Sequence, residues 1–229
     1  MKKVKERAKS SDDAEKRARR AVIETALAMS RSGLSPGRSG NVSCRWKGGM
    51  LITPTGMAYE TIKPRDIVFI TNKGTLPSKS ARKPSSEWRF HLAAYRARPD
   101  MSAVVHTHSL NATVLACAHR AIPAFHYMVA VAGGKDIPLV PYDTFGTEEL
   151  AAHVAQGLAG RNACLMANHG QIAIGRDLGS ALELAREVEV LAEQYGKVLA
   201  LGEPHLLSDA EMTRVLERFK HYGQNAQRA

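Results

Sequence analysis

Short apolar runs rich in β-branched residues alternate with segments of helical periodicity along almost the whole of this 229-residue chain. Such interleaving is typical of an α/β protein. Several neighbouring strands look like hairpins, and the length suits one domain. The sequence therefore predicts a single-domain three-layer α/β/α sandwich with a central mixed, largely antiparallel sheet. The predicted strands lie within 42–46, 50–55, 66–71, 101–109, 137–142 and 163–175, and the predicted helices within 14–32, 85–98, 110–117, 148–158, 178–201 and 209–222.

Positive charge is concentrated at the start of the chain. Residues 1–20 hold nine Lys or Arg against four Asp or Glu, which is half of the net charge of +10. We expect one domain over residues 1–229, with residues 1–13 forming a mobile basic arm that attracts anions in general. No recognition-helix, RNP-like or zinc-finger pattern accompanies this charge, so a nucleic-acid partner is not expected.

Targeting features and cysteines give an expectation for the compartment. No run approaches the ~18 apolar residues of a membrane-spanning helix, and the first twenty residues lack the apolar region of a signal peptide. Cys44, Cys117 and Cys164 are odd in number and widely spaced, so they do not form a disulfide framework. We expect a cytoplasmic protein without a membrane partner.

Two histidines stand one residue apart in the strand-like run AVVHTHS. Side chains at i and i+2 of a strand project from the same face, so His106 and His108 can converge while Thr107 faces away. Two imidazoles suit a divalent cation, and catalytic zinc takes a tetrahedral site with one open position. The pair alone is a weak motif, and a hydrogen-bonded core imidazole is the alternative for His106.

Three further features strengthen the hypothesis of a metal site. His169 stands at a bend between two apolar runs, and Glu87 stands in the first turn of a predicted helix. The turns GRSGN and TPTGM carry the hydroxyls and glycines that bind oxyanions through backbone N–H groups. Each feature has an ordinary alternative: a turn histidine, an acid complementing the helix dipole, and a simple helix cap at Ser85 or Ser86.

Taken together, these motifs resemble the class II aldolase/adducin-head superfamily, and most closely its L-fuculose-1-phosphate aldolase branch. The likeness runs from about residue 15 to residue 223, and its order and spacing are more specific than any one motif. The matching stretches are SGNVS (39–43), MLITPTGMAYE (50–60), SSEWRFHLAAYRARPD (85–100), AVVHTHS (103–109), IPAFHYMVA (122–130), YDTFGTEEL (142–150), NHG (168–170) and ERFKHYG (217–223).

The resemblance implies a catalytic centre. The imidazoles of His106, His108 and His169 would bind Zn²⁺, or another divalent transition metal. Glu87 would be the fourth ligand, and the base for proton transfer once substrate displaces it. Tyr127 resembles a tyrosine that a neighbouring subunit contributes to the active site.

The resemblance also implies a phosphate site and a cover for the substrate. Phe219 and Tyr222 resemble terminal-helix residues that cover the aldehyde end. Arg38 departs from the family pattern, which is GTAGN or GTSGN, and its guanidinium either adds a bidentate phosphate contact or marks a different substrate. The residues that resemble phosphate-binding turns are Gly40, Asn41, Thr55, Gly56, Ser85 and Ser86.

The function that the resemblance implies is a zinc-dependent aldolase that reversibly cleaves a ketose 1-phosphate into dihydroxyacetone phosphate and a short aldehyde. A homotetramer is expected. A cation stabilises the negative charge left on the three-carbon fragment, and a carboxylate supplies its proton. The alternatives are an aldolase for a 5-deoxy or 5-methylthio ketose 1-phosphate, an epimerase, dehydratase or decarboxylase on the same metal scaffold, and a non-catalytic adducin-like scaffold.

Overall fold

Seven strands form one central sheet in the computed structural model, which describes residues 2–76, 80 and 82–221, with the backbone alone for residues 2–11. The strand order is β3-β2-β1-β4-β7-β6-β5. Neighbouring strands are antiparallel except β5 and β6, which are parallel. The strands are β1 (Asn41–Trp46), β2 (Gly49–Ile52), β3 (Val68–Thr71), β4 (Ala103–Thr107), β5 (Leu139–Val140), β6 (Ala163–Met166) and β7 (Gly170–Gly175).

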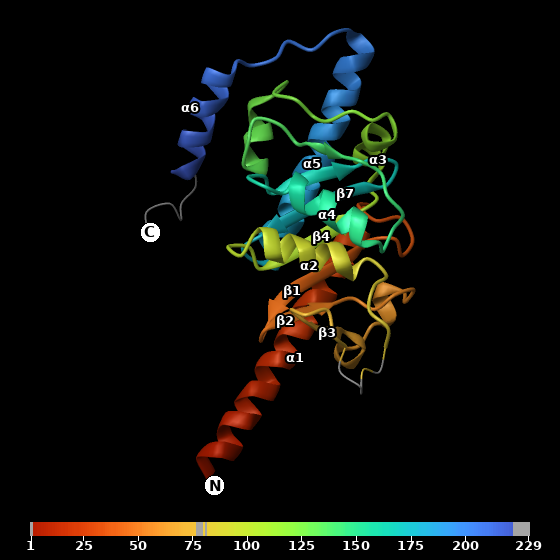
Figure 1. Cartoon of the computed structure of the whole chain (residues 1–229), viewed down its shortest axis with the longest axis vertical. Coiled ribbons are helices and arrows are strands. Elements are labelled where there is room, and N and C mark those ends of the chain that lie inside the picture. Colours follow the sequence, from red (N-terminus) through yellow and green to blue (C-terminus); the bar gives the residue numbers. More distant parts are fainter. Residues whose placement is uncertain (1, 77–79, 81, 222–229) are drawn as a thin grey trace.

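Helices cover both faces of this sheet (Figure 1). Helices α2 and α4 pack against each other on one face, and α1, α3 and α5 lie on the other, where α6 packs against η3. The predicted three-layer α/β/α sandwich is confirmed. The helices are α1 (Lys2–Arg31), α2 (Trp88–Ala97), α3 (Leu110–Cys117), α4 (Glu148–Gly157), α5 (Leu178–Leu201) and α6 (Asp209–Lys220), and the 3-10 turns are η1 (Tyr59–Thr61), η2 (Pro64–Asp66) and η3 (Tyr127–Ala132).

The sheet separates two hydrophobic cores. Along β4, Val105 belongs to the larger core under α5, whereas Val104 belongs to the smaller core under α2 and α4. This alternation follows from the period of two in a strand. Because both faces of β4 are covered, the strand reads as a continuous apolar run rather than an alternating one. His106 lies on the same face as Val104, toward α2.

Helix α1 begins at Lys2, earlier than the expected start near residue 14. Residues 2–17 contain no Gly or Pro and are rich in Lys, Arg, Glu and Ala, which are good helix formers. An i,i+4 ion pair between Glu15 and Arg19, 2.7 Å apart, adds to the helix. The amino-terminal half of α1 extends beyond the sheet (Figure 1). The single domain over residues 1–229 and the mobility of residues 1–13 stay predictions.

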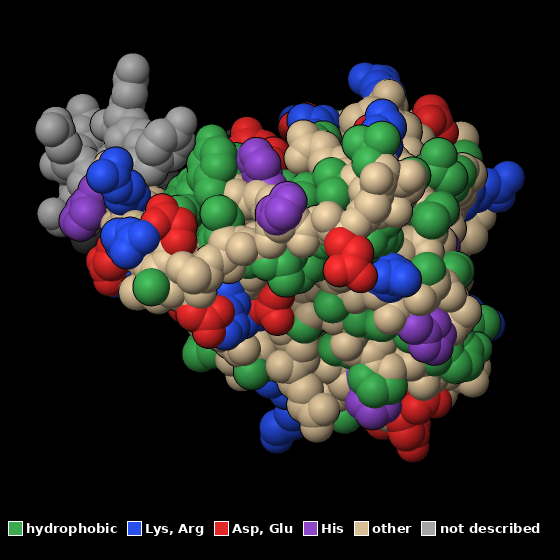
Figure 2. All heavy atoms as spheres, turned by 90° about the horizontal axis from the view of Figure 1, so that it is seen from above, with side chains coloured by type: hydrophobic (Ala, Val, Ile, Leu, Met, Phe, Trp, Pro, Cys, Tyr) green, Lys and Arg blue, Asp and Glu red, His purple; other side chains and the backbone are tan. Residues whose placement is uncertain are grey.

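The molecular surface at the opposite end carries charges of both signs. Basic and acidic side chains lie side by side on this face, interspersed with hydrophobic ones and histidines (Figure 2). The positive net charge is therefore not gathered into one patch on the face shown. Within the described part of the chain, no helix combines the length and the apolar character needed to cross a bilayer.

Candidate metal centre

Four potential ligands meet at the end of β4. His106 is on the strand, and His108 directly follows the last residue of the strand. The Nε2 atoms of the two histidines are 3.0 Å apart. His169 stands at the bend between β6 and β7, and Glu87 directly precedes α2. One ligand atom from each of the four residues lies within 4.8 Å of the others. The structure thus brings together all four residues that the sequence predicts as ligands.

The position of β4 in the sheet explains why these side chains meet. β4 lies between β1 and β7, and it pairs with both. A Cβ at Gly170 would lie 2.4 Å from the carbonyl oxygen of Thr107, so only glycine lets β7 start this close to the end of β4. The preceding Asn168 has a positive φ of 54°, which turns the chain there. His169 is thereby held beside the β4 histidines.

Hydrogen bonding prepares the histidines for metal binding. His106 is fully buried, and its Nδ1 donates to the carbonyl oxygen of Gln171 at 2.8 Å. A carbonyl only accepts, so Nδ1 carries a proton, and Nε2 is the nitrogen of this ring that would face a metal ion. Burial, reinforced by the neighbouring His106 and His169, lowers the pKa of His108 to about 3. Neutral imidazole is the form that ligates metals.

Glu87 is buried among hydrogen-bonding partners. Its Oε1 is 2.9 Å from Nε2 of His169, its Oε2 is 3.3 Å from Nε2 of His106, and Asn41 Nδ2 donates to Oε2 at 2.8 Å. Burial would by itself raise the pKa of this carboxyl, but the charge and hydrogen bonds of His106 and His169 hold it well below its usual value. Glu87 is therefore ionised.

The start of α2 differs from the sequence expectation. The residue at the N-cap is Glu87, and the expected cap at Ser85 or Ser86 is wrong. The Glu87 side chain makes no hydrogen bond to the helix, because it is turned toward the histidines. Ser85 Oγ instead accepts from the Glu87 backbone N–H at 3.3 Å. The orientation of the Glu87 carboxylate therefore favours contact with the histidines over a simple interaction with the helix dipole.

The donor set fits a divalent transition-metal ion. Three imidazole nitrogens and one carboxylate form a compact group, and catalytic zinc sites use this kind of N and O ligation. The tautomer of His106 leaves its Nε2 free to ligate. The four residues could therefore hold one ion.

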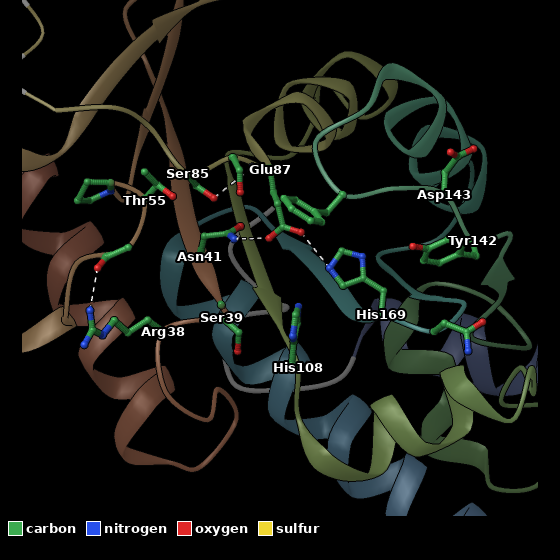
Figure 3. Close-up of a pocket in the computed structure, with 16 residues that line it drawn as sticks. Arg38, Ser39, Asn41, Thr55, Ser85, Glu87, His108, Tyr142, Asp143 and His169 are labelled. Atoms are coloured by element: carbon green, nitrogen blue, oxygen red, sulfur yellow. Dashed lines mark hydrogen bonds and ion pairs between the residues drawn. The ribbon is translucent and has the colours of Figure 1, made fainter.

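A cavity of about 420 Å³ opens beside the ligands (Figure 3). Glu87, His108 and His169 line it, as do residues from both glycine-containing turns. The structure therefore places the predicted phosphate-binding residues beside the candidate metal centre. Those lining the cavity are Arg38, Gly40, Asn41, Thr55, Gly56, Ser85 and Ser86.

The hydrogen bonds of the turns narrow down which groups can contact a phosphate. The backbone N–H groups of Gly40, Thr55 and Ser85 donate to Ser35 Oγ, Lys83 O and Thr53 O, respectively. These three N–H groups are already committed within the protein. Hydroxyls, the other N–H groups of the turns and the Arg38 guanidinium are the donors that remain for a ligand.

Arg38 joins the two turns. Its Nη1 donates to the carbonyl oxygen of Gly56 at 3.0 Å, and the side chain is otherwise exposed (Figure 3). Among the described residues lining the cavity, Arg38 is the only one with a Lys or Arg side chain, whereas Glu87 and Asp143 contribute acidic groups. The guanidinium is thus the cationic side chain of the cavity lining, beside the two glycine-containing turns.

Sequence reasoning missed one wall of the cavity. Tyr142, Asp143 and Phe145 lie in the segment between β5 and α4 and line the cavity. Tyr142 and Phe145 are 56% and 62% exposed. Their only sequence signal was the stretch YDTFGTEEL, which matched the family without suggesting a role.

Two other predicted residues, Tyr127 and Phe219, are not among the described residues that line this cavity. Tyr127, on η3, is 51% exposed and is not among the residues lining the cavity of its own chain. Phe219, on α6, packs partly buried against the larger core. Tyr222 lies outside the described residues. Their roles in binding or catalysis stay predictions.

Comparisons with known proteins show the family to which this chain belongs. The family described as "Class II Aldolase and Adducin N-terminal domain" matches residues 20–195. A 5-methylthioribulose-1-phosphate/5-deoxyribulose-1-phosphate aldolase of Rhodospirillum rubrum is 53% identical over 91% of this chain and 94% of its own length. L-fuculose phosphate aldolase of Escherichia coli strain K12 is 52% identical over 89% of this chain and 94% of its own. A solved L-fuculose 1-phosphate aldolase superposes with a TM-score of 0.85 at 40% identity, over 89% of this chain and 96% of that one. The chain therefore belongs to the class II aldolase and adducin N-terminal domain family.

Proposed function

We propose that this protein is a metal-dependent class II aldolase that cleaves the C3–C4 bond of a ketose 1-phosphate. The products are dihydroxyacetone phosphate and a short aldehyde. The observation that carries the proposal is the convergence of Glu87 with three histidine imidazoles beside a cavity that the two glycine-containing turns border. Relatives named as sugar-phosphate aldolases support it.

Zn²⁺ is the proposed ion, and another divalent transition metal is the alternative. His106, His108 and His169 would hold it, with Glu87 as a displaceable fourth ligand. A bound divalent ion supplies Lewis-acid stabilisation of the negative charge that develops on the three-carbon fragment. Metal analysis of the purified protein checks the identity of the ion.

Glu87 and Tyr127 are the proposed proton-transfer groups. During cleavage the C4 hydroxyl loses its proton, the C3–C4 electron pair stays on C3, and C3 gains a proton. The Glu87 carboxylate borders the cavity (Figure 3). In condensation it removes the C3 proton, and in cleavage it first takes up a proton from solvent and then gives it to C3. Tyr127 from a neighbouring copy accepts the proton of the C4 hydroxyl.

Arg38 and the two turns are the proposed phosphate site. The exposed guanidinium is held between the turns by the carbonyl of Gly56, and charge-assisted hydrogen bonds to phosphate are among the stronger ones. Ser85, Ser86 and Thr55 carry hydroxyls at the same end of the cavity. Together they would orient the 1-phosphate so that C3 faces Glu87.

We also propose a cytoplasmic homo-oligomer, with a tetramer as the expected form. Tyr127 is half exposed outside its own cavity, and Leu110 and Val114 on α3 are 72% and 56% exposed, which offers apolar surface to another copy. Mixing Glu87→Gln and Tyr127→Phe proteins should restore part of the activity, since some sites then receive both intact residues. A fully active monomer in sedimentation would contradict this assembly. The three cysteines are free thiols, which supports a reducing compartment.

A screen of ketose 1-phosphates with coupled detection of dihydroxyacetone phosphate tests the proposed reaction. L-Fuculose 1-phosphate, 5-deoxyribulose 1-phosphate and 5-methylthioribulose 1-phosphate come first, because relatives of nearly equal identity carry those names. Product analysis separates cleavage from epimerisation, dehydration and decarboxylation. A metal-loaded protein that releases dihydroxyacetone phosphate from none of them would refute the proposal, and a protein that binds no metal would point to a scaffold.

A further inference from the structure

A chain of buried hydrogen bonds leads from Glu87 into the protein between β1 and α2. Asn41 Nδ2 donates to Glu87 Oε2 at 2.8 Å (Figure 3), and Asn41 Oδ1 is hydrogen-bonded to His91 Nε2. Ser43 Oγ is 2.7 Å from His91 Nδ1 and 2.8 Å from the Tyr95 hydroxyl. His91 and Ser43 are fully buried, and Asn41 and Tyr95 are nearly so.

The direction of every bond in this chain follows from its first member. A carboxylate only accepts, so Asn41 must turn its NH₂ to Glu87 and its oxygen to His91. His91 must then carry its proton on Nε2. Burial lowers the pKa of His91 to about 3, so the ring is neutral and Nδ1 is an acceptor. Ser43 donates to Nδ1, and Tyr95 donates to Ser43 Oγ.

This polarity controls the Asn41 amide. A flipped amide would place its oxygen against the carboxylate oxygen of Glu87 and its NH₂ against the Nε2–H of His91. At Glu87 one acceptor would then face another acceptor, and at His91 one donor would face another donor. Polar groups left unpaired in a buried site are costly. The Nε2–H of His91 therefore reinforces the amide orientation that the Glu87 carboxylate requires.

We propose that His91 is a positioning residue for proton transfer at Glu87. Through Asn41 it holds Oε2 of the carboxylate, so that Oε1 remains the oxygen that exchanges a proton with C3. The inference rests on the proposed aldolase function and deepens it. Oε1 is the oxygen near His169, whereas Oε2 is the one that Asn41 holds.

Two amide substitutions at His91 separate positioning from bulk structure. In His91→Gln the amide nitrogen can replace Nε2 and still donate to Asn41. In His91→Asn the shorter side chain can replace only Nδ1, and the donor to Asn41 is lost. Tyr95→Phe serves as a control, because it removes only the Tyr95 hydroxyl, the last member of the hydrogen-bond series, and leaves the hydrogen bond from Ser43 to His91 in place.

The readouts are exchange of solvent deuterium into C3 of dihydroxyacetone phosphate, kcat and KM for the ketose 1-phosphate, and metal content per chain. We expect His91→Asn to lower kcat and the exchange rate about 10–100-fold, with KM and metal content nearly unchanged. His91→Gln should stay within about threefold of wild type on the same reasoning. Equal losses in the two variants, or full activity in both, would overturn the positioning role.

A measurement on metal-free, ¹⁵N-labelled protein tests the inference without turnover. The imidazole nitrogen shifts should report His91 as the Nε2–H tautomer, and the Nδ1–H tautomer would overturn the proposal. If neither amide variant folds, Ser43→Ala replaces them. This variant loses the hydroxyl that donates to Nδ1 of His91, so the rate of deuterium exchange should fall several-fold. An exchange rate equal to that of the wild type would contradict the role of this series of hydrogen bonds. Wild-type protein that neither exchanges nor cleaves would instead refute the aldolase function.

Discussion

Replacing Glu87 with Gln is the most direct test of the catalytic centre. The carboxylate has Oε2 at 2.8 Å from Asn41 Nδ2 and Oε1 at 2.9 Å from His169 Nε2. A glutamine has one oxygen, and Asn41 requires an acceptor, so that oxygen will face Asn41. The position of Oε1 is then taken by an NH₂ group, which cannot accept a proton.

The chemical role proposed for Glu87 sets the expected size of the effect. Loss of a general acid–base group lowers rates by about 10²–10⁴-fold, which corresponds to about 3–5 kcal/mol of transition-state stabilisation. The three imidazoles remain, so metal should still bind. Exchange of solvent deuterium into dihydroxyacetone phosphate should fall in parallel with kcat, because both need proton transfer at C3.

The assay combines coupled detection of dihydroxyacetone phosphate, deuterium exchange and metal content per chain. Glu148→Gln is the matched control, because Glu148 is an exposed carboxylate that pairs with Arg89 outside the cavity lining. It should leave all three readouts unchanged. A Glu87→Gln protein with full metal content and a kcat within a few-fold of wild type would refute the assignment of Glu87 as the proton-transfer group.

Four further predictions follow from individual contacts. Between pH 7 and pH 5 the free energy of unfolding of the metal-free wild type should fall by roughly 2 kcal/mol more than that of His91→Gln. In the unfolded chain His91 gains a proton near pH 6.5, whereas in the folded protein it does so only near its pKa of about 3. Equal losses for the two proteins in urea titrations would contradict this. Arg38→Thr should raise KM for the ketose 1-phosphate about tenfold at low salt with little change in kcat, since a charge-assisted contact is lost, and an unchanged KM would exclude a phosphate contact. Gly170→Ala should destabilise the protein by about 1–3 kcal/mol and reduce metal content, because its Cβ would lie 2.4 Å from the carbonyl oxygen of Thr107. A stability and a metal content equal to those of the wild type would be evidence against the close approach of Gly170 to Thr107. Removal of metal by a chelator should lower Tm, and added Zn²⁺ should restore it in proportion to the logarithm of its concentration, whereas a Tm independent of metal would argue against the site.

The sequence was sufficient to predict the residues of the candidate metal centre, because they are either close together in the chain or part of motifs in a recognisable order. His106 lies on β4 and His108 directly follows its last residue, so their convergence needs little more than the period of a strand. Glu87 and His169 entered through stretches whose order resembles a family. The layered fold followed from the alternation of strands and helices, although the strand order did not, since the partners of β4 come from both directions along the chain.

Other features needed coordinates because they depend on contacts between distant side chains. Nothing in the sequence around His91 indicates its hydrogen-bond partner, yet its side chain is hydrogen-bonded to Asn41, fifty positions away. Asn41 itself was predicted in a phosphate turn, and its amide is hydrogen-bonded to Glu87 instead of pointing freely into the cavity. Phe145 and its neighbours lie in a segment without periodicity, so no pattern could place them against the ligands.

The central place of β4 has a consequence for the order of events during folding. The ligands come from segments near residues 87, 106 and 169, and the last two meet only after β4 has paired with β7. Such non-local pairing is slow compared with helix or hairpin formation. Before this pairing, the chain would offer an ion only the pair His106 and His108 at the end of β4, without the other candidate ligands. High-affinity ion uptake would then be a late step, and its appearance in a refolding experiment would report completion of the sheet rather than its nucleation.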